Sequence, residues 1–322
     1  MIPIRDTIQS RNYPIVNNAI IAVNIIVFMI EIMFVSGIDR FIFTYGLVPA
    51  RYTVPSIALH FTLFDQLFSF LSFMFLHGGF WHLLGNMWFL YIFGDNVEDH
   101  LGHVKYLVFY LLCGLLSGLT HFIVNFSSPI PTIGASGAVA GVMGAYFILY
   151  PRSRVLTMIP IIIIPYFIEV PAAFFLALWF LFQFISAAFS DAQTAGIAWW
   201  AHIGGFLFGI VVLKIMEVLP SFDVPGILRD VTKRTRTPRL QVVKPADGDG
   251  EYDIHGSITI TQGEAAEGTK KLITIRRGLE KKLFMVTIPP GITEGATLRL
   301  KGMGKKRDDH RRGDVYLKII VR

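Results

Sequence analysis

The chain has 322 residues, of which 53% are hydrophobic and only 16% are charged, with a formal net charge of +6. A soluble globular protein typically has about a quarter of its residues charged, so this composition excludes an ordinary soluble protein. Long apolar runs are confined to residues 15–219, whereas residues 251–322 are polar and strongly charged. We therefore expect one membrane domain followed by one small soluble domain.

The single cysteine, Cys113, lies inside an apolar run, which excludes an intramolecular disulfide and a thiolate metal cluster. We expect no metal and no cofactor. The first apolar run, residues 15–35, is long enough to span a bilayer and has no small-residue cleavage site after a short core. It therefore predicts a membrane span and not a secretory signal.

Six apolar segments have the length and hydropathy of membrane-spanning helices. They cover residues 15–36, 67–94, 105–124, 133–150, 167–188 and 199–216. The remaining segments connect these spans. They are a polar tail (residues 1–14), an amphipathic connection expected at the membrane interface (37–66), a polar turn (95–100), a short loop (125–132), an apolar stretch punctuated by prolines (155–166) and a polar loop (190–197). The predicted fold of residues 15–217 is an all-α polytopic membrane domain.

Lysine and arginine are found in the N-terminal tail, in the second and fourth loops and after the last predicted span. The third and fifth loops have none, whereas the first loop has Arg40 and Arg51. The positive-inside rule then places both termini in the cytoplasm. We expect a multi-pass protein of the bacterial cytoplasmic (inner) membrane. In this topology the fourth and sixth spans both begin at the outer surface.

The fourth predicted span begins with small residues repeated every four positions. Gly137, Gly141 and Ala145 form one series, and Ser136, Ala140 and Gly144 form the other. This spacing places each series on one helix face, where small residues allow neighbouring backbones to approach closely. Ser136 is thus either one more packing residue or a nucleophile.

His202 lies near the start of the sixth predicted span, beside a second small-residue series of Ala201, Gly205 and Gly209. Because both spans start at the same surface, Ser136 and His202 are expected at similar depths. A serine needs an adjacent base to become a nucleophile, and histidine can supply it. The alternative is a buried histidine that donates to a backbone carbonyl.

His82 and Asn86 lie four residues apart in the second predicted span and so share one helix face. Their side chains can stabilise the oxyanion that forms at a scissile carbonyl. Hydrogen bonding between helices is the alternative role. His77, nearby, is expected to support the local loop.

Three motifs in this order resemble the rhomboid intramembrane serine proteases. They are His82-x-x-x-Asn86, Gly134-x-Ser136-Gly137 and Ala201-His202-x-x-Gly205-x-x-x-Gly209, and Glu98 and Gly102 also match the turn after the second span. The resemblance covers residues 15–217, although the Trp-Arg pair often seen in the first loop of that family is absent from this sequence.

The resemblance implies a Ser–His dyad, with Ser136 as nucleophile and His202 as general base and then general acid. It implies an oxyanion hole made by Asn86, His82 and the backbone N–H groups of Ser136 and Ala135. Glycines that support helix packing would be Gly134, Gly137, Gly141, Gly205 and Gly209. No Asp or Glu is placed to orient His202, which is consistent with a dyad.

The substrates implied are single-span or multi-span membrane proteins, cleaved near the outer face of the bilayer. Their helices would have to unwind locally, which favours small or helix-breaking residues near the cleaved bond. A catalytically silent rhomboid-like protein that binds membrane or unfolded clients is the alternative function.

Residues 218–250 contain several prolines and a cluster of basic residues, and we interpret them as a linker beside anionic membrane lipids. Nucleic-acid binding is not expected of a basic segment in this position.

Residues 251–322 contain five short β-rich segments separated by turns, which predicts a small all-β sandwich. The run from Val286 to Gly302, followed by residues 313–317, resembles the C-terminal β-domain of DnaJ/Hsp40 co-chaperones, and residues 253–268 match its start. No J-domain His-Pro-Asp and no Cys-rich zinc module occur in the sequence. Two roles of this domain are compatible with the sequence: it binds a peptide or protein partner, or it regulates the protease.

Overall fold

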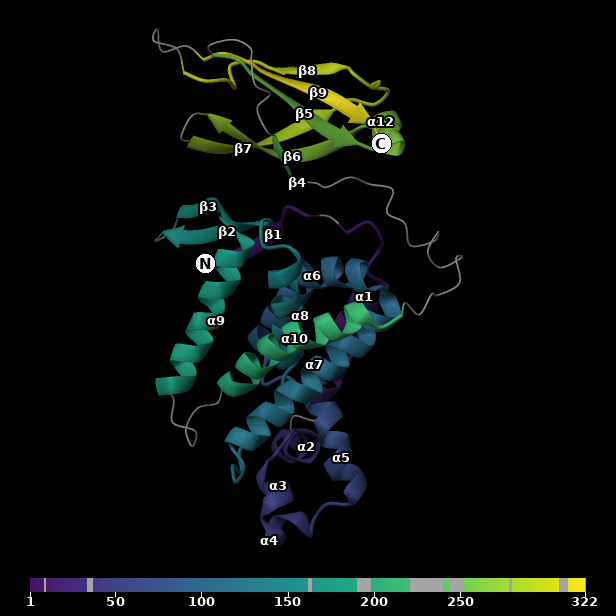
Figure 1. The fold of residues 1–322 in the computed structure, drawn as a ribbon, viewed down its shortest axis with the longest axis vertical. Helices are drawn as coiled ribbons and strands as arrows, with labels where there is room; N and C mark the ends of the chain where they lie inside the picture. The colour runs from purple at the N-terminus through teal and green to yellow at the C-terminus, as the bar shows by residue number, and fades with distance from the viewer. Residues whose placement is uncertain are drawn as a thin grey trace. The chain divides into compact units, whose positions relative to one another are not determined.

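The fold is described from a computed structural model of residues 1–322. The structure describes residues 1–8, 10–33, 37–161, 164–189, 198–220, 240–243, 252–277, 280–306 and 312–321. The chain divides into two compact units, one holding most of residues 1–232 and the other residues 233–322 (Figure 1). The division falls inside the predicted linker, and we describe each unit by itself.

The first unit is mainly helical. Its helices are α1 (Ile15–Met33), α2 (Ile38–Tyr45), α3 (Ala50–Thr53), α4 (Pro55–Ala58), α5 (Leu63–Ser72), the 3-10 helix η2 (Phe73–Phe75), α6 (Phe80–Leu101), α7 (His103–Val124), α8 (Ser136–Leu149), α9 (Ala172–Phe189) and α10 (Trp199–Val218). Four of them, α1, α7, α9 and α10, are long and apolar enough to cross a membrane, and the bent pair α5–α6 would make a fifth. The first unit is therefore a multi-pass membrane domain. The predicted number of six spans is not reached by this criterion, because α8 has only 14 residues.

The predicted second span, residues 67–94, is not one continuous helix. It is broken between η2 and α6, and the two helical parts are bent by 76°. Gly79 at the break has φ of 154°, a conformation that residues with a Cβ rarely adopt. The backbone N–H of His77 donates to both carboxylate oxygens of Glu31 in α1, each at 3.1 Å, so the break is held from a neighbouring helix.

The predicted polar turn at residues 95–100 is also wrong, since α6 continues to Leu101 and the chain turns at Gly102, where φ is 79°. Helical geometry directs the acidic side chains of this last turn towards the start of α1. Glu98 accepts the backbone N–H groups of Val16 and Asn17 at 3.0 and 2.7 Å. These are among the four N–H groups that have no acceptor within the helix, so Glu98 caps α1.

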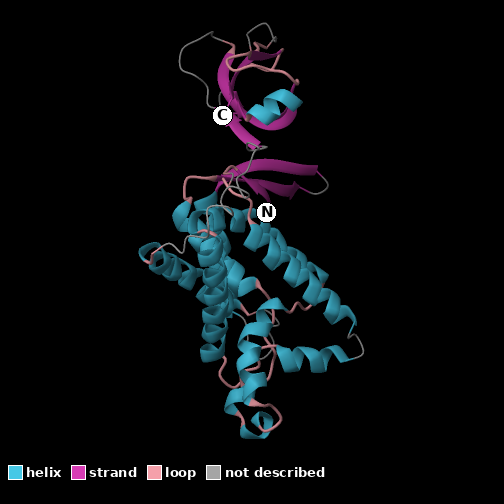
Figure 2. Cartoon of the chain, turned by 90° about the vertical axis from the view of Figure 1, so that its right-hand side faces the viewer, coloured by secondary structure: helices cyan, strands magenta, loops and turns pink. Residues whose placement is uncertain are grey.

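A three-stranded antiparallel sheet joins the N-terminus to the segment between α8 and α9 (Figure 2). It consists of β1 (Ile2–Asp6), β2 (Arg154–Ile161) and β3 (Ile164–Pro171), with β2 in the centre. The sequence analysis predicted a polar tail for the first segment, and for the second an apolar stretch followed by the fifth span from residue 167. The start of that span is wrong, because residues 167–171 belong to β3 and α9 begins at Ala172. A lone strand of five residues becomes stable only through its pairing partners, which lie far away in the chain.

Helix α8 forms the centre of the membrane domain. All ten residues from Gly137 to Tyr146 are buried, and α8 packs against α6, α7 and α10. Helix α9 lies at the edge of the bundle next to α10 (Figure 1). This arrangement makes the N-terminus of α8, where Ser136 lies, the point on which the neighbouring helices converge.

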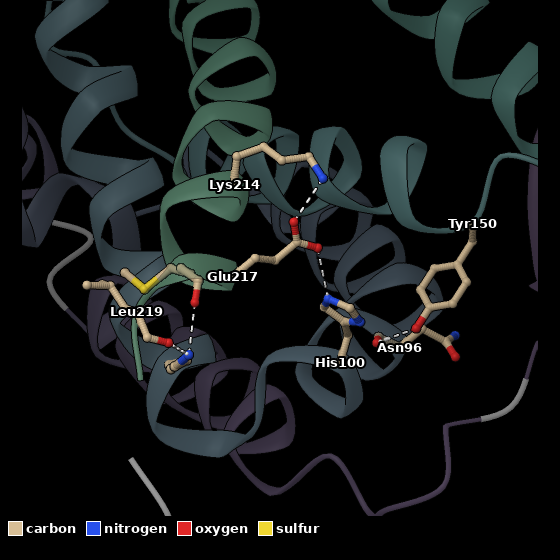
Figure 3. Close-up of polar contacts among 8 residues, drawn as sticks. Asn96, His100, Tyr150, Lys214, Glu217 and Leu219 are labelled. Carbon is tan, nitrogen blue, oxygen red and sulfur yellow. Dashed lines mark hydrogen bonds and ion pairs between the residues drawn. The ribbon is translucent and has the colours of Figure 1, made fainter. Parts of the chain in front are cut away.

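The ends of four helices are joined by polar contacts at the opposite end of α8 (Figure 3). Glu217 of α10 accepts from Lys214 at 2.8 Å and contacts His100 of α6 at 3.2 Å. The Tyr150 hydroxyl, just after α8, donates to the carbonyl of Asn96 at 3.1 Å. Lys105 of α7 donates to the carbonyls of Met216 and Leu219, which end α10.

The second unit has two three-stranded sheets that share one hydrophobic cluster. One sheet has the order β4-β6-β7 and the other β5-β9-β8. The elements are β4 (Leu240–Val243), β5 (Ile254–Ile260), α12 (Gln262–Glu267), β6 (Thr269–Arg277), β7 (Glu280–Ile288), β8 (Thr297–Leu300) and β9 (Val315–Val321). The prediction of β-structure is confirmed, whereas α12 and strand β4 within the predicted linker were not foreseen.

Candidate active site

Ser136 and His202 meet at the N-terminal ends of α8 and α10. The Oγ atom of Ser136 lies 2.8 Å from Nε2 of His202, although 66 residues separate them. Ser136 is the first residue of α8, so its backbone N–H has no acceptor within the helix. The serine hydroxyl and the imidazole are therefore within direct proton-transfer distance.

Glycines bring these two helices together. A Cβ atom on Gly205 would lie 2.9 Å from the carbonyl carbon of Gly137, and one on Gly209 would lie 2.5 Å from the Cα of Gly141. A Cβ on Gly137 would in turn overlap the side chain of Ser117 in α7. The four-residue spacing noted in the sequence thus forms the contact face between α8 and α10.

His202 has a second partner that the sequence analysis missed. Its Nδ1 atom lies 2.8 Å from Oε1 of Gln183 in α9, and Gln183 is buried, with 7% of its surface exposed. The rings of Trp179 and Trp199 are also neighbours of the imidazole, each with its centroid 6.0 Å away; Trp179 is tilted by 35° and Trp199 is edge-on at 88°. The sequence contains a signal that could have revealed this partner, namely a glutamine inside an apolar span. Polar side chains in the membrane usually have a specific partner.

His82 of α6 faces the same point from the other side. The backbone N–H of Gly78 donates to Nδ1 of His82 at 3.4 Å, which leaves the proton of a neutral ring on Nε2. That Nε2 would lie 2.8 Å from a Cβ on Gly134, and Ser136 Oγ 3.5 Å from the same position. Gly134 has φ of 130°, so the absence of a side chain both permits this backbone and leaves room for the ring.

Asn86 adds a free donor. It lies one turn after His82 on α6, and its buried Nδ2 has no hydrogen-bond partner among the described residues. A buried amide donor without a partner is costly and calls for an explanation, and a role in binding a ligand atom is one. Ala135 immediately precedes α8, and its carbonyl accepts the N–H of Val139.

The part of the chain that the structure describes contains no group of three or more His, Cys, Asp or Glu side chains that could hold a metal ion. The chemistry that these residues can carry out is nucleophilic attack by a serine with proton transfer to a histidine.

Two family models match this chain. The family model of the rhomboid domain matches residues 65–217, and that of the DnaJ C terminal domain matches residues 254–322. Residues 65–217 form a rhomboid domain. The matched range includes Ser136, His202, His82 and Asn86, together with Gln183, which the sequence analysis had not singled out.

Several curated proteins are similar to this rhomboid domain. "Rhomboid protein 1, mitochondrial" of Saccharomyces cerevisiae is 25% identical over 181 residues, covering 53% of this chain and 45% of the relative. "RHOMBOID-like protein 5" of Arabidopsis thaliana is 35% identical over 75 residues, covering 23% of this chain and 24% of the relative. "Presenilin-associated rhomboid-like protein, mitochondrial" of Mus musculus is 29% identical over 145 residues, covering 42% and 34%.

The chain spans about half the length, or less, of the curated relatives it matches. The printed names place the Saccharomyces cerevisiae and Mus musculus relatives in mitochondria and "Rhomboid-like protein 11, chloroplastic" of Arabidopsis thaliana in chloroplasts. The predicted bacterial inner membrane and the predicted orientation of the termini gain no support from them.

Proposed function

We propose that this protein is an intramembrane serine endopeptidase that cleaves transmembrane segments of other membrane proteins. The observation that carries the proposal is the 2.8 Å contact between Ser136 Oγ and His202 Nε2, two half-buried residues at the point where α8 and α10 converge. Peptide hydrolysis requires an activated nucleophile and a base within hydrogen-bond reach, and this pair provides both.

In the proposed mechanism, His202 Nε2 takes the proton of the Ser136 hydroxyl as Oγ attacks the scissile carbonyl carbon. The imidazolium then gives this proton to the leaving amine, which leaves an acyl-enzyme. Water, deprotonated by the same nitrogen, attacks the acyl carbon and releases the second product and Ser136. His202 thus serves as base and acid alternately.

The negative charge that develops on the carbonyl oxygen needs donors that are already in place. We assign this role to the Nε2–H of His82, the free Nδ2 of Asn86 and the backbone N–H groups of Ser136 and Ala135. The N-terminus of α8 adds its positive dipole end at the same point.

We also propose that the membrane domain crosses the bilayer six times, with α8 as a short central span that is surrounded by protein. Ten consecutive buried residues support this view, since a helix enclosed by other helices need not match the full bilayer thickness. The second unit would be a small β-sandwich that binds a peptide or protein partner or regulates the protease.

The test is cleavage of a model single-span substrate by the full-length protein in liposomes. We expect cleavage by wild type and none by Ser136→Ala or His202→Ala. Ser117→Ala is the matched control and should retain activity, because Ser117 is buried in α7 and, among the described residues, its hydroxyl donates to the carbonyl of Gly114. Cleavage by Ser136→Ala at the wild-type rate would refute the proposal and favour a silent, client-binding protein.

A further inference from the structure

We infer that Gln183 of α9 is a positioning residue that fixes the tautomer and orientation of His202. The inference rests on the proposed function and adds a third member to the predicted dyad. It comes from the 2.8 Å contact between Gln183 Oε1 and His202 Nδ1, on the side of the ring opposite Ser136.

The hydrogen bonds of Gln183 determine which way its amide group faces. Its Nε2 donates to the carbonyl of Trp179, one turn earlier in α9, at 3.2 Å. The amide oxygen therefore faces His202. A carbonyl oxygen can only accept, so the hydrogen of this bond must be on His202 Nδ1.

This assignment decides the state of the reacting nitrogen. A neutral imidazole with its proton on Nδ1 has a lone pair on Nε2, and that lone pair faces Ser136 Oγ at 2.8 Å. The serine hydroxyl must then be the donor in this bond, which is the arrangement that a general base requires. With the proton on Nε2 instead, the ring could not accept the serine proton.

A glutamine is well suited to this position in a membrane. It supplies a fixed acceptor without a charge that burial would penalise, and the Gln183 side chain is buried. The indole of Trp179, from the same face of α9, lies against the imidazole and limits its rotation. Because α9 is at the edge of the bundle (Figure 1), the base is correctly held only while α9 is in place.

The test compares wild type with Gln183→Met, which keeps the side-chain length and removes the acceptor, and with Gln183→Glu, which restores an acceptor. Phe184→Met is the matched control, because it places the same new side chain on the exposed face of α9. Each full-length protein is measured for kcat and KM with the single-span substrate and for Ser136 labelling by a fluorophosphonate. The His202 tautomer is read from imidazole ¹⁵N chemical shifts, assigned by their loss in His202→Ala.

We expect Gln183→Met to lower kcat about 10²-fold with little change in KM, a loss typical of a misplaced catalytic group. Its His202 signal should lose the Nδ1–H pattern. Gln183→Glu should recover most of kcat and the Nδ1–H pattern, and Phe184→Met should match wild type in both measurements. Recovery of kcat in Gln183→Glu would show that the loss in Gln183→Met comes from the missing hydrogen-bond acceptor and not from a general packing defect.

Two results would overturn the inference. One is a Gln183→Met protein that cleaves at the wild-type rate, and the other is an unchanged Nδ1–H pattern in that variant. If wild type itself neither cleaves nor is labelled, the proposed function fails. The chemical shifts then still decide whether Gln183 sets the His202 tautomer, because they need no turnover.

Discussion

A Cβ atom on Gly205 of α10 would overlap the carbonyl group of Gly137 in α8, at the level of the candidate active site. The backbones of the two helices therefore touch directly, without side chains between them. Such contact between small residues is what allows helices to associate tightly in a membrane. It also sets the separation of Ser136 and His202, because each of these residues lies within one turn of the contact.

Gly205→Ala should therefore push α10 away from α8. We expect the free energy of unfolding to fall by about 1–3 kcal/mol, the usual cost of overpacking, and cleavage to be lost. Gly85→Ala in α6 is the control, since no atom of the described residues outside its own helix lies within 4 Å of its added Cβ. Thermal unfolding in detergent measures the difference, and equal unfolding temperatures for the two variants would contradict direct backbone contact.

Asn86→Leu should impair the chemical step more than substrate binding. The variant keeps a similar volume and removes the free Nδ2 donor, so we expect kcat to fall by about 10²–10³-fold with KM little changed. Asn24→Leu replaces a buried amide of α1 that donates to Ile20 and should leave kcat unchanged. A loss confined to KM would assign Asn86 to substrate binding instead.

The packing of strand β1 against α6 and α8 should become less stable as the pH rises. Burial, followed by the nearby Asp95 charge, raises the pKa of the Asp6 carboxyl well above its usual value. Asp6 accepts the hydroxyl of Tyr146 at 2.6 Å and the amide of Asn96 at 2.9 Å. The folded protein holds the Asp6 proton more tightly than the unfolded chain does. The protonated carboxyl therefore contributes fully to the free energy of unfolding below about pH 4, and this contribution is lost as the pH rises through the pKa of the folded state.

Asp6→Asn should remove this dependence. We expect the variant to be more stable than wild type near pH 8 and the two proteins to converge near pH 4, as measured by the unfolding temperature across that range. Asp39→Asn, at an exposed position of α2, is the matched control. Parallel curves for wild type and Asp6→Asn would contradict the assignment.

A buried ion pair in the second unit should be sensitive to removal of one partner. Lys271 and Glu264 form a salt bridge in which Lys271 is 1% and Glu264 7% exposed, and Glu264 also accepts the N–H of Thr261 as part of a capping box. Lys271→Met should cost about 3–5 kcal/mol, since it removes the opposite charge next to a buried carboxylate.

The double variant Lys271→Met/Glu264→Gln should recover most of that loss, because the amide keeps the cap on α12 and carries no charge. Hydrogen exchange of amides in β5, β6 and β9 of the full-length protein measures both variants. Equal losses in the single and double variants would show that the lysine stem, and not the charge, stabilises this unit.

The local patterns of the sequence predicted two of the helices closely, α7 and α10. The ends of α7 and α10 were predicted to within two residues, because uninterrupted apolar runs flanked by polar residues fix a span by themselves. The break at residues 76–79 was missed, since hydropathy continues through it and only Gly78 and Gly79 mark it. The loop at residues 190–197 and most of the predicted linker lie outside the described residues.

By itself, then, the sequence determined the membrane class, the small-residue faces, and the candidate residues Ser136, His202, His82 and Asn86, because period, composition and motif are properties of neighbouring positions. Only the tertiary structure decided which distant groups meet: β1 with β2, Asp6 with Tyr146, and Gln183 with His202. The physical reason is that a buried polar group in a membrane must find a partner. The sequence reveals that need, and the packing of the helices selects the partner.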